Sequence, residues 1–264
     1  MDRAQAFTEL MQAHRSIRSF KPDPLPHDLI NPLLEDALHG TSSSGNLNMI
    51  SVVKTQDAAR KAQLCELHGG QPMVLQAPLL LTFCADSFRT REWLALRGAR
   101  AGFADFVSWH VAGYDAMILS QTVALALESH GLGICYMGTT LFAMRDIADY
   151  LELPPNSLPV TTLVVGWPAE APAQRDRLPG AAWIHEERYS RPTAADIEAR
   201  FAEREERGRA RYMDFNPQMA ALWKDHGISS LAQYYTSKIK YDPDLFEGFS
   251  ADMEALLRER GFLR

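Results

Sequence analysis

The sequence predicts an α+β fold, in which helices and strands are mixed along the chain. Strand-like runs lie at 49–54, 79–84 and 160–167, and the last of them is rich in β-branched residues. Helical periodicity separates these runs without the strict strand–helix–strand repeat of a parallel α/β sheet. With 264 residues, of which 46% are hydrophobic, the chain can bury a full core.

The N-terminal part predicts two helices before the first strand. Apolar residues recur at helical spacing within 7–11, which predicts a helix that ends near His14. Residues 29–38 carry a second helical stripe, and Gly40 ends it in the usual C-terminal position. A serine-rich loop then leads to the first strand.

The middle of the chain predicts further helices around the second strand. Residues 57–67 form one, with Ala58, Ala62 and Cys65 facing inward. Segment 86–102 has no clear period, which predicts a loop or lid over a site or, equally, a plain surface insertion. That segment contains four arginines: Arg89, Arg91, Arg97 and Arg100.

Residues 103–130 are apolar on nearly every side, so this long helix should be enclosed by neighbours rather than lie on a surface. The neighbours belong either to a monomeric core or to a second subunit. Residues 142–151 predict another helix before the last strand.

The composition changes beyond Pro192. Residues 194–211 are dense in Glu and Arg and predict a solvated helix. The tail after them holds several aromatic residues, which are costly to leave in water, so the tail should pack on this subunit or on its partner. These aromatic residues are Trp223, Tyr234, Tyr235, Phe246 and Phe249. We therefore expect two parts, a domain at 1–192 and a C-terminal helical extension at 193–264.

Charge and composition argue against several classes of function. A net charge of −6 gives no electrostatic reason to expect a nucleic-acid partner. No apolar run reaches the roughly 18 residues of a membrane span, and the N-terminus lacks the apolar core of a signal peptide, so a cytoplasmic protein is expected. The three cysteines form no CxxC pair, and the histidines lack metal-ligand spacing, which indicates neither disulfides nor a bound metal.

The stretch His14-Arg15-Ser16-Ile17-Arg18 places two guanidiniums and a hydroxyl where the first predicted helix ends. Arg15 and Arg18 can emerge together there, and their forked donors with the Ser16 hydroxyl suit a phosphate group. A solvated basic helix end is the alternative interpretation of this stretch taken alone.

Further segments follow in order along the chain. They are Thr41-Ser42-Ser43-Ser44-Gly45-Asn46, Gly69-Gly70-Gln71-Pro72, Gly131-Leu132-Gly133-Ile134-Cys135-Tyr136-Met137-Gly138, Gly166-Trp167-Pro168 and Arg177-Leu178-Pro179. Together with 14–18, they resemble the FMN-dependent nitroreductase family, and more closely its oxygen-insensitive, flavin-reductase-like branch that prefers NADPH. The resemblance runs from about residue 5 to about residue 190. It implies a three-layer sandwich with a mixed, mainly antiparallel sheet flanked by helices, in an intertwined homodimer that includes helix 103–130.

The resemblance also implies which residues bind FMN. It assigns the phosphate to His14, Arg15, Ser16, Arg18, Arg175 and Arg177. It assigns the ribityl chain or the pyrimidine ring to Ser42, Ser43 and Ser44, the pyrimidine edge to Gln71, and the underside of the ring to Tyr136, Met137, Gly138 and Thr139. A surface pairing of Arg175 and Arg177 with Asp176, and a serine loop with no ligand, are the alternatives that the residues alone leave open.

The implied function is transfer of hydride from NADPH or NADH through the flavin to nitroaromatic or quinone acceptors, in a ping-pong sequence. Catalysis then needs no side-chain acid or base, because flavin N5 carries the chemistry and a backbone N–H near Gly138 assists. A flavin reductase that supplies reduced flavin and a non-catalytic flavin-binding module are the alternatives.

Two departures from the family bear on specificity. Thr139 stands where many relatives have a second glycine. The usual arginines for NADPH do not align with 213–217, although Arg207, Arg209 and Arg211 lie just upstream.

Overall fold

The computed structural model describes residues 2–26, 28–100, 102–103 and 105–263. They form two compact units, the sheet unit (Met1–Ala173 with Met253–Arg264) and the helical unit (Gln174–Asp252). This division differs from the predicted parts at 1–192 and 193–264. The last residues return to the sheet unit because Leu256, Leu257 and Phe262 are buried in a cluster with Met144 and Leu158.

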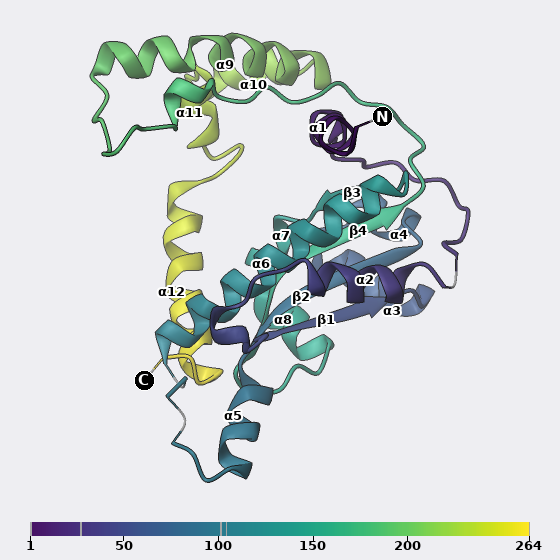
Figure 1. The fold of residues 1–264 in the computed structure, drawn as a ribbon. Coiled ribbons are helices and arrows are strands. Elements are labelled where there is room, and N and C mark those ends of the chain that lie inside the picture. Colours follow the sequence, from purple (N-terminus) through teal and green to yellow (C-terminus); the bar gives the residue numbers. More distant parts are fainter. Residues whose placement is uncertain (1, 27, 101, 104, 264) are drawn as a thin grey trace. The chain divides into compact units, whose positions relative to one another are not determined.

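The sheet unit is built on four antiparallel strands (Figure 1), in the order β1-β2-β4-β3. Their bounds are Ile50–Thr55 for β1, Leu79–Asp86 for β2, Gly133–Tyr136 for β3 and Ser157–Gly166 for β4. Strand β2 is buried at every residue. A parallel bridge between Ser16 and Ile134 adds a further segment beside β3, so the sheet is mixed and mainly antiparallel, as predicted.

Helices cover both faces of this sheet. One face packs on α2 (Ile30–His39) and α6 (Phe106–Ser129), in a core that includes Leu81, Phe83 and Leu163. The other face, which includes Leu80 and Val164, packs on α3 (Ala58–Leu67), α4 (Pro72–Gln76) and α8 (Met144–Tyr150). Neighbouring strand residues thus point into opposite cores, as the two-residue period of a strand requires. The predicted three-layer arrangement is confirmed.

The remaining elements of the sheet unit are short. They are α1 (Arg3–Ala13), the 3-10 turn η1 (Ser44–Asn46), α5 (Phe88–Leu96) and α7 (Thr139–Phe142). The predicted helix at 142–151 corresponds to α8, and the short α7 precedes it, with Ala143 between the two. In α3, the inward residues are Lys61, Leu64 and Cys65, whereas Ala58 and Ala62 are exposed, so that part of the prediction is wrong.

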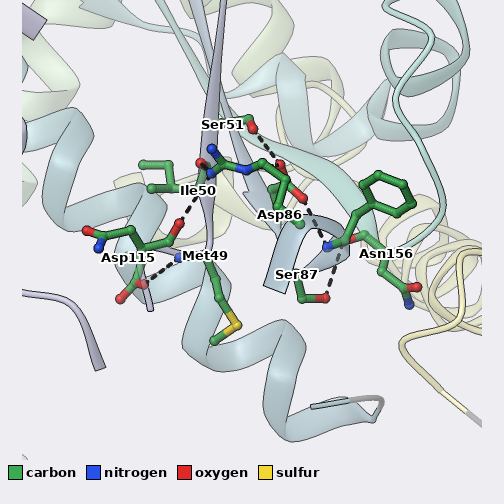
Figure 2. A network of polar contacts seen from close by, with 10 residues as sticks. Met49, Ile50, Ser51, Asp86, Ser87, Asp115 and Asn156 are labelled. Carbon is green, nitrogen blue, oxygen red and sulfur yellow. Dashed lines mark hydrogen bonds and ion pairs between the residues drawn. The ribbon is translucent and has the colours of Figure 1, made fainter. Parts of the chain in front are cut away.

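Segment 86–102 contains helix α5 rather than only a loop or lid. The Asp86 carboxylate accepts the N–H of Phe88 at 3.0 Å and satisfies one of the free donors in the first turn. Two of the four arginines in segment 86–102 have structural partners. Arg89 donates to the Ile50 carbonyl, and Arg91 donates to the side chain of Asn156. Asp86 also accepts a bond from Ser51, and Figure 2 shows this network beside the strand ends.

The helical unit contains α9 (Ala194–Phe215), α10 (Met219–Asp225), α11 (Leu231–Tyr235), the 3-10 turn η2 (Gly180–Ala182) and the start of α12 (Pro243–Glu259). A capping box of Thr193 and Asp196 begins α9. As predicted, α9 is largely solvated, and two of the tail aromatics are buried, with Trp223 and Tyr234 stacked at 5.3 Å. Within the described part of the chain, no helix has the length and apolar character needed to cross a membrane.

Candidate functional site

The 14–18 segment runs along the free edge of β3. The Ile17 N–H donates to the Ile134 carbonyl at 2.9 Å, and the Ile17 side chain is buried in the core. Gly133 makes this approach possible, because a Cβ there would lie only 2.7 Å from Ile17 Cγ1. The fold therefore holds the segment by its apolar residue and leaves Ser16 half-buried and Arg18 exposed.

His14 is oriented by a carboxylate on α6. Its Nδ1 lies 2.7 Å from Oε1 of Glu128, which is 10% exposed. Burial raises the pKa of Glu128, while the hydrogen bond and charge of His14 lower it. The second oxygen of Glu128 is buried and has no partner among the described residues. The contact with Glu128 therefore fixes the orientation of the imidazole, with Nδ1 toward Glu128 and Nε2 on the opposite side of the ring.

A cavity of about 460 Å³ adjoins this pair. Its lining includes His14, Arg15 and Glu128 together with 131–133, Pro168 and 170–173. The Arg15 guanidinium donates to the Ala13 carbonyl at 2.6 Å, and that of Arg18 donates to the Ser16 carbonyl at 3.4 Å. Each guanidinium has five N–H donors, so most of them are left for an anion.

Glu170 fixes the backbone of the same segment. Its carboxylate accepts the N–H of Arg18 and, at 3.1 Å, that of Ser19. The N–H groups of Arg18 and Ser19 are therefore already used within the fold. An anion at this segment would meet the guanidiniums and the Ser16 hydroxyl rather than these two N–H groups.

A second cluster joins Gln71 with Thr139. The Gln71 amide nitrogen donates to the His68 carbonyl at 3.0 Å and lies 3.4 Å from the Thr139 hydroxyl, and that hydroxyl lies 2.9 Å from His68 Nδ1. His68 is fully buried, and this burial lowers its pKa to about 4. Gly69 and Gly70 have positive φ values of 73° and 69°, and a Cβ at either would meet no atom within 4 Å.

The segment after β3 also faces open space. Met137 is buried and its N–H donates to the Thr162 carbonyl at 2.8 Å, whereas the N–H of Gly138 bonds to no other described residue. A Cβ at Gly138 would meet no atom within 4 Å. Tyr136, by contrast, uses its hydroxyl within the fold, 3.2 Å from the Ser120 hydroxyl.

The serine loop is tied to Asp115 of α6 through the side chain of Ser43 and the backbone N–H of Ser44, which lies 3.4 Å from the carboxylate. The Ser43 hydroxyl donates to Asp115 at 2.7 Å and accepts the Asn48 N–H at 2.8 Å. The buried Asp115 also accepts the Met49 N–H at 3.1 Å, as seen in Figure 2. Ser43 therefore has a structural role, while Ser42 and Ser44 are exposed.

Arg175 and Arg177 belong to the helical unit. The Arg177 guanidinium donates to the carbonyls of Arg175 and Asp176 at 3.3 and 3.0 Å. The Asp176 carboxylate bonds Arg204 and Arg211 at 3.0 and 3.1 Å rather than Arg177. Burial alone would raise the pKa of Asp176, but these two arginines hold it below its ordinary value. That Arg175 and Arg177 join the phosphate site stays a prediction.

Sequence reasoning missed three residues that orient the candidates, namely Glu128, Glu170 and His68. His68 directly precedes the glycine pair of the Gly-Gly-Gln motif, which is a local signal of its position. Glu128 and Glu170 lie 114 and 152 residues from their partners, so no local pattern links them.

Comparison with known proteins places this geometry in a family. Residues 11–167 match the nitroreductase family, and the chain belongs to it. It is 36% identical to the FMN reductase [NAD(P)H] of Bacillus subtilis over 178 residues, which are 67% of this chain and 71% of that protein. It is 34% identical to the oxygen-insensitive NADPH nitroreductase of Salmonella typhimurium over 195 residues, 74% of this chain and 79% of that protein.

Solved structures show the same fold. An oxidoreductase from Bacteroides fragilis superimposes with a TM-score of 0.85 at 36% identity, covering 97% of this chain and 100% of the other. The NADPH:FMN oxidoreductase from Vibrio harveyi, complexed with NAD+, has a TM-score of 0.73 at 25% identity and covers 98% and 99%.

Proposed function

We propose that this chain is an FMN-dependent oxidoreductase that passes hydride from NADPH or NADH to nitroaromatic or quinone acceptors in a ping-pong sequence. The observation that carries the proposal is the cavity at the edge of β3, which His14 and Arg15 line. Ser16 and Arg18 are their neighbours in the chain, on a segment held at β3 by the Ile17 N–H. The names of the relatives from Bacillus subtilis and Salmonella typhimurium support the same chemistry.

The residues present fit FMN. Guanidiniums of Arg15 and Arg18 with the Ser16 hydroxyl would bind its phosphate, and Gln71 would meet its pyrimidine edge. The open space at Gly138 admits a flat ring, and the N–H there would donate to flavin N5. When bound, the flavin accepts and returns hydride at N5. The chain's own residues bind and orient it, so we assign no side-chain acid or base.

We further propose that the active form is a homodimer. Five large apolar residues on α6 are 44 to 66% exposed in the single chain, which is costly in water and is not the enclosed helix that the sequence predicts. A second copy of this chain would enclose them. They are Phe106, Val107, Tyr114, Met117 and Ile118.

The second candidate function is a flavin reductase that supplies reduced flavin. The similarity to an FMN reductase at 36% identity favours it specifically. It differs from the first candidate in the acceptor, which would be free FMN rather than a nitroaromatic or quinone.

Steady-state oxidation of NADPH and NADH by the purified yellow protein tests these candidates. We expect oxidation that requires an added acceptor, with parallel double-reciprocal plots when donor and acceptor are varied. Nitrofurazone, 1,4-benzoquinone and free FMN are compared as acceptors at equal concentration. A preference for free FMN would favour the flavin reductase. A protein that binds FMN and oxidises neither donor with any acceptor would be a binding module, and the proposal would be wrong.

A further inference from the structure

We propose that Thr139 and His68 are positioning residues that hold the Gln71 amide in one orientation, with its carbonyl oxygen presented to the N3–H of the flavin pyrimidine ring. The inference rests on the proposed FMN site and goes beyond it, because it concerns how Gln71 is set before the flavin arrives. The three residues come from the end of α3, the start of α4 and the start of α7.

The two N–H donors of the Gln71 side-chain amide define its orientation. A glutamine amide nitrogen has two N–H donors. In Gln71, one is directed at the His68 carbonyl, 3.0 Å away, and the other at the Thr139 hydroxyl, 3.4 Å away. The carbonyl oxygen of the same amide accepts no hydrogen bond from the described residues. The amide therefore faces a ligand as an acceptor.

The Thr139 hydroxyl needs an acceptor of its own to keep that role. His68 Nδ1 lies 2.9 Å from it. Full burial keeps the imidazole neutral, since it lowers the His68 pKa to about 4, and a neutral ring can accept a bond at Nδ1. In the tautomer that carries its proton on Nε2, Gln71 donates to the Thr139 hydroxyl and this hydroxyl donates to His68 Nδ1.

His68 Nε2 is buried and has no partner in the described part of the chain. A buried polar atom without a partner costs free energy. Within the described residues, the hydrogen bond of the imidazole is therefore the one between Nδ1 and Thr139.

The surroundings leave room for the ligand. A Cβ at Gly69, Gly70 or Gly138 would meet no atom within 4 Å, and these glycines adjoin Gln71 and Thr139 in the chain. A glycine at 139 would have no hydroxyl and could not restrain Gln71. The proposed restraint therefore depends on the side chain at this one position.

The test compares the dissociation constants of FMN and of 3-methyl-FMN, which has no N3–H, measured with apoprotein by quenching of flavin fluorescence. We expect the wild type and Thr139→Ser to prefer FMN. Thr139→Val keeps the shape and loses the hydroxyl, so its amide can turn and donate to the ring carbonyls that both flavins carry. Its preference for FMN should fall at least threefold.

Thr140→Val is the matched control, because the hydroxyl of the neighbouring Thr140 is buried and has no hydrogen-bond partner among the described residues. Its preference should equal that of the wild type. An unchanged preference in Thr139→Val would overturn the inference. Thr139→Ala provides the same comparison if the valine variant folds poorly. A wild type that binds neither flavin would instead refute the FMN site, so the two failures are distinguishable.

Discussion

Replacing Gly133 with alanine tests how closely the edge of β3 controls the proposed phosphate site. A Cβ at this position would lie 2.7 Å from Cγ1 and 2.9 Å from Cβ of Ile17. Ordinary carbon–carbon contact begins at about 3.5 Å. The two groups would have to separate by roughly 0.8 Å, the difference between 3.5 and 2.7 Å.

Displacing the Ile17 side chain would reduce the stability of the fold. It is 6% exposed, packs in the core beneath the sheet and donates its N–H to the Ile134 carbonyl at 2.9 Å. Overpacking of this kind destabilises by about 1–3 kcal/mol. Ser16 and Arg18 flank Ile17 and move with it, and loss of one charged hydrogen bond to the phosphate costs about 1.5–3 kcal/mol. We therefore expect FMN affinity to fall about 10- to 150-fold.

Urea unfolding of the apoprotein measures the free energy of unfolding, and fluorescence quenching measures FMN affinity. Gly248→Ala is the control, since it lies in helix α12 and its Cβ would meet no atom within 4 Å. It should leave FMN affinity unchanged and stabilise by up to about 1 kcal/mol. If Gly133→Ala has the urea midpoint and FMN affinity of the wild type, the contact with Ile17 does not control the site and the reasoning is refuted.

Three further predictions use other parts of the chain. Arg18→Ala should weaken FMN binding by about 1.5–3 kcal/mol in an equilibrium titration. The control Arg60→Ala, at an exposed position, should not weaken it. If Arg18→Ala binds FMN as tightly as the wild type, Arg18 does not belong to the site. With one quinone as acceptor, kcat/KM for NADPH should exceed kcat/KM for NADH by less than about a hundredfold, or 2.7 kcal/mol. The reason is that Arg207 and Arg211 already form ion pairs with acidic side chains. A larger ratio would contradict this prediction. His68 stays neutral when folded and is protonated near pH 6.5 when unfolded, so its contribution to stability is lost as the pH falls from about 6.5 towards 4. Urea unfolding at several pH values should show that His68→Asn loses roughly 3 kcal/mol less than the wild type over this range, and identical pH dependence in both would refute it.

The long buried elements could be predicted from the sequence because burial leaves a periodic pattern. The predicted strands at 49–54, 79–84 and 160–167 lie within or close to β1, β2 and β4. Strand β3 has four residues, of which the first is a glycine, so it is too short to show a period. Helix α5 was not predicted because its arginines obscure the apolar pattern. Asp86 accepts the Phe88 N–H two residues before the helix begins, but it is not the N-cap residue, which is Ser87.

The residue types of the candidate site could be predicted from the sequence, but the contacts that these residues make could not. Arginines beside a serine are typical of a phosphate site or of a solvated basic helix end. The carboxylate that orients His14 comes from the far end of α6, where no local pattern indicates it. Ser43 has the same composition signal as Ser42 and Ser44, yet its hydroxyl is used by the buried Asp115. Such roles depend on tertiary contacts that leave no local pattern.

The glycines of the sheet edge connect stability with the proposed function. Gly133 and Gly166 face each other in register on β3 and β4. A Cβ at Gly166 would lie 2.9 Å from the ring of Phe20, just as one at Gly133 would meet Ile17. A glycine weakens a strand by roughly 0.5–1 kcal/mol, whereas burying Ile17 or Phe20 contributes about 1.5–3 kcal/mol each. The burial of Ile17 and Phe20 therefore outweighs the cost of the two glycines. It holds the chain on both sides of Arg18, which would bind the phosphate, so substitutions at either glycine should affect folding and FMN binding together.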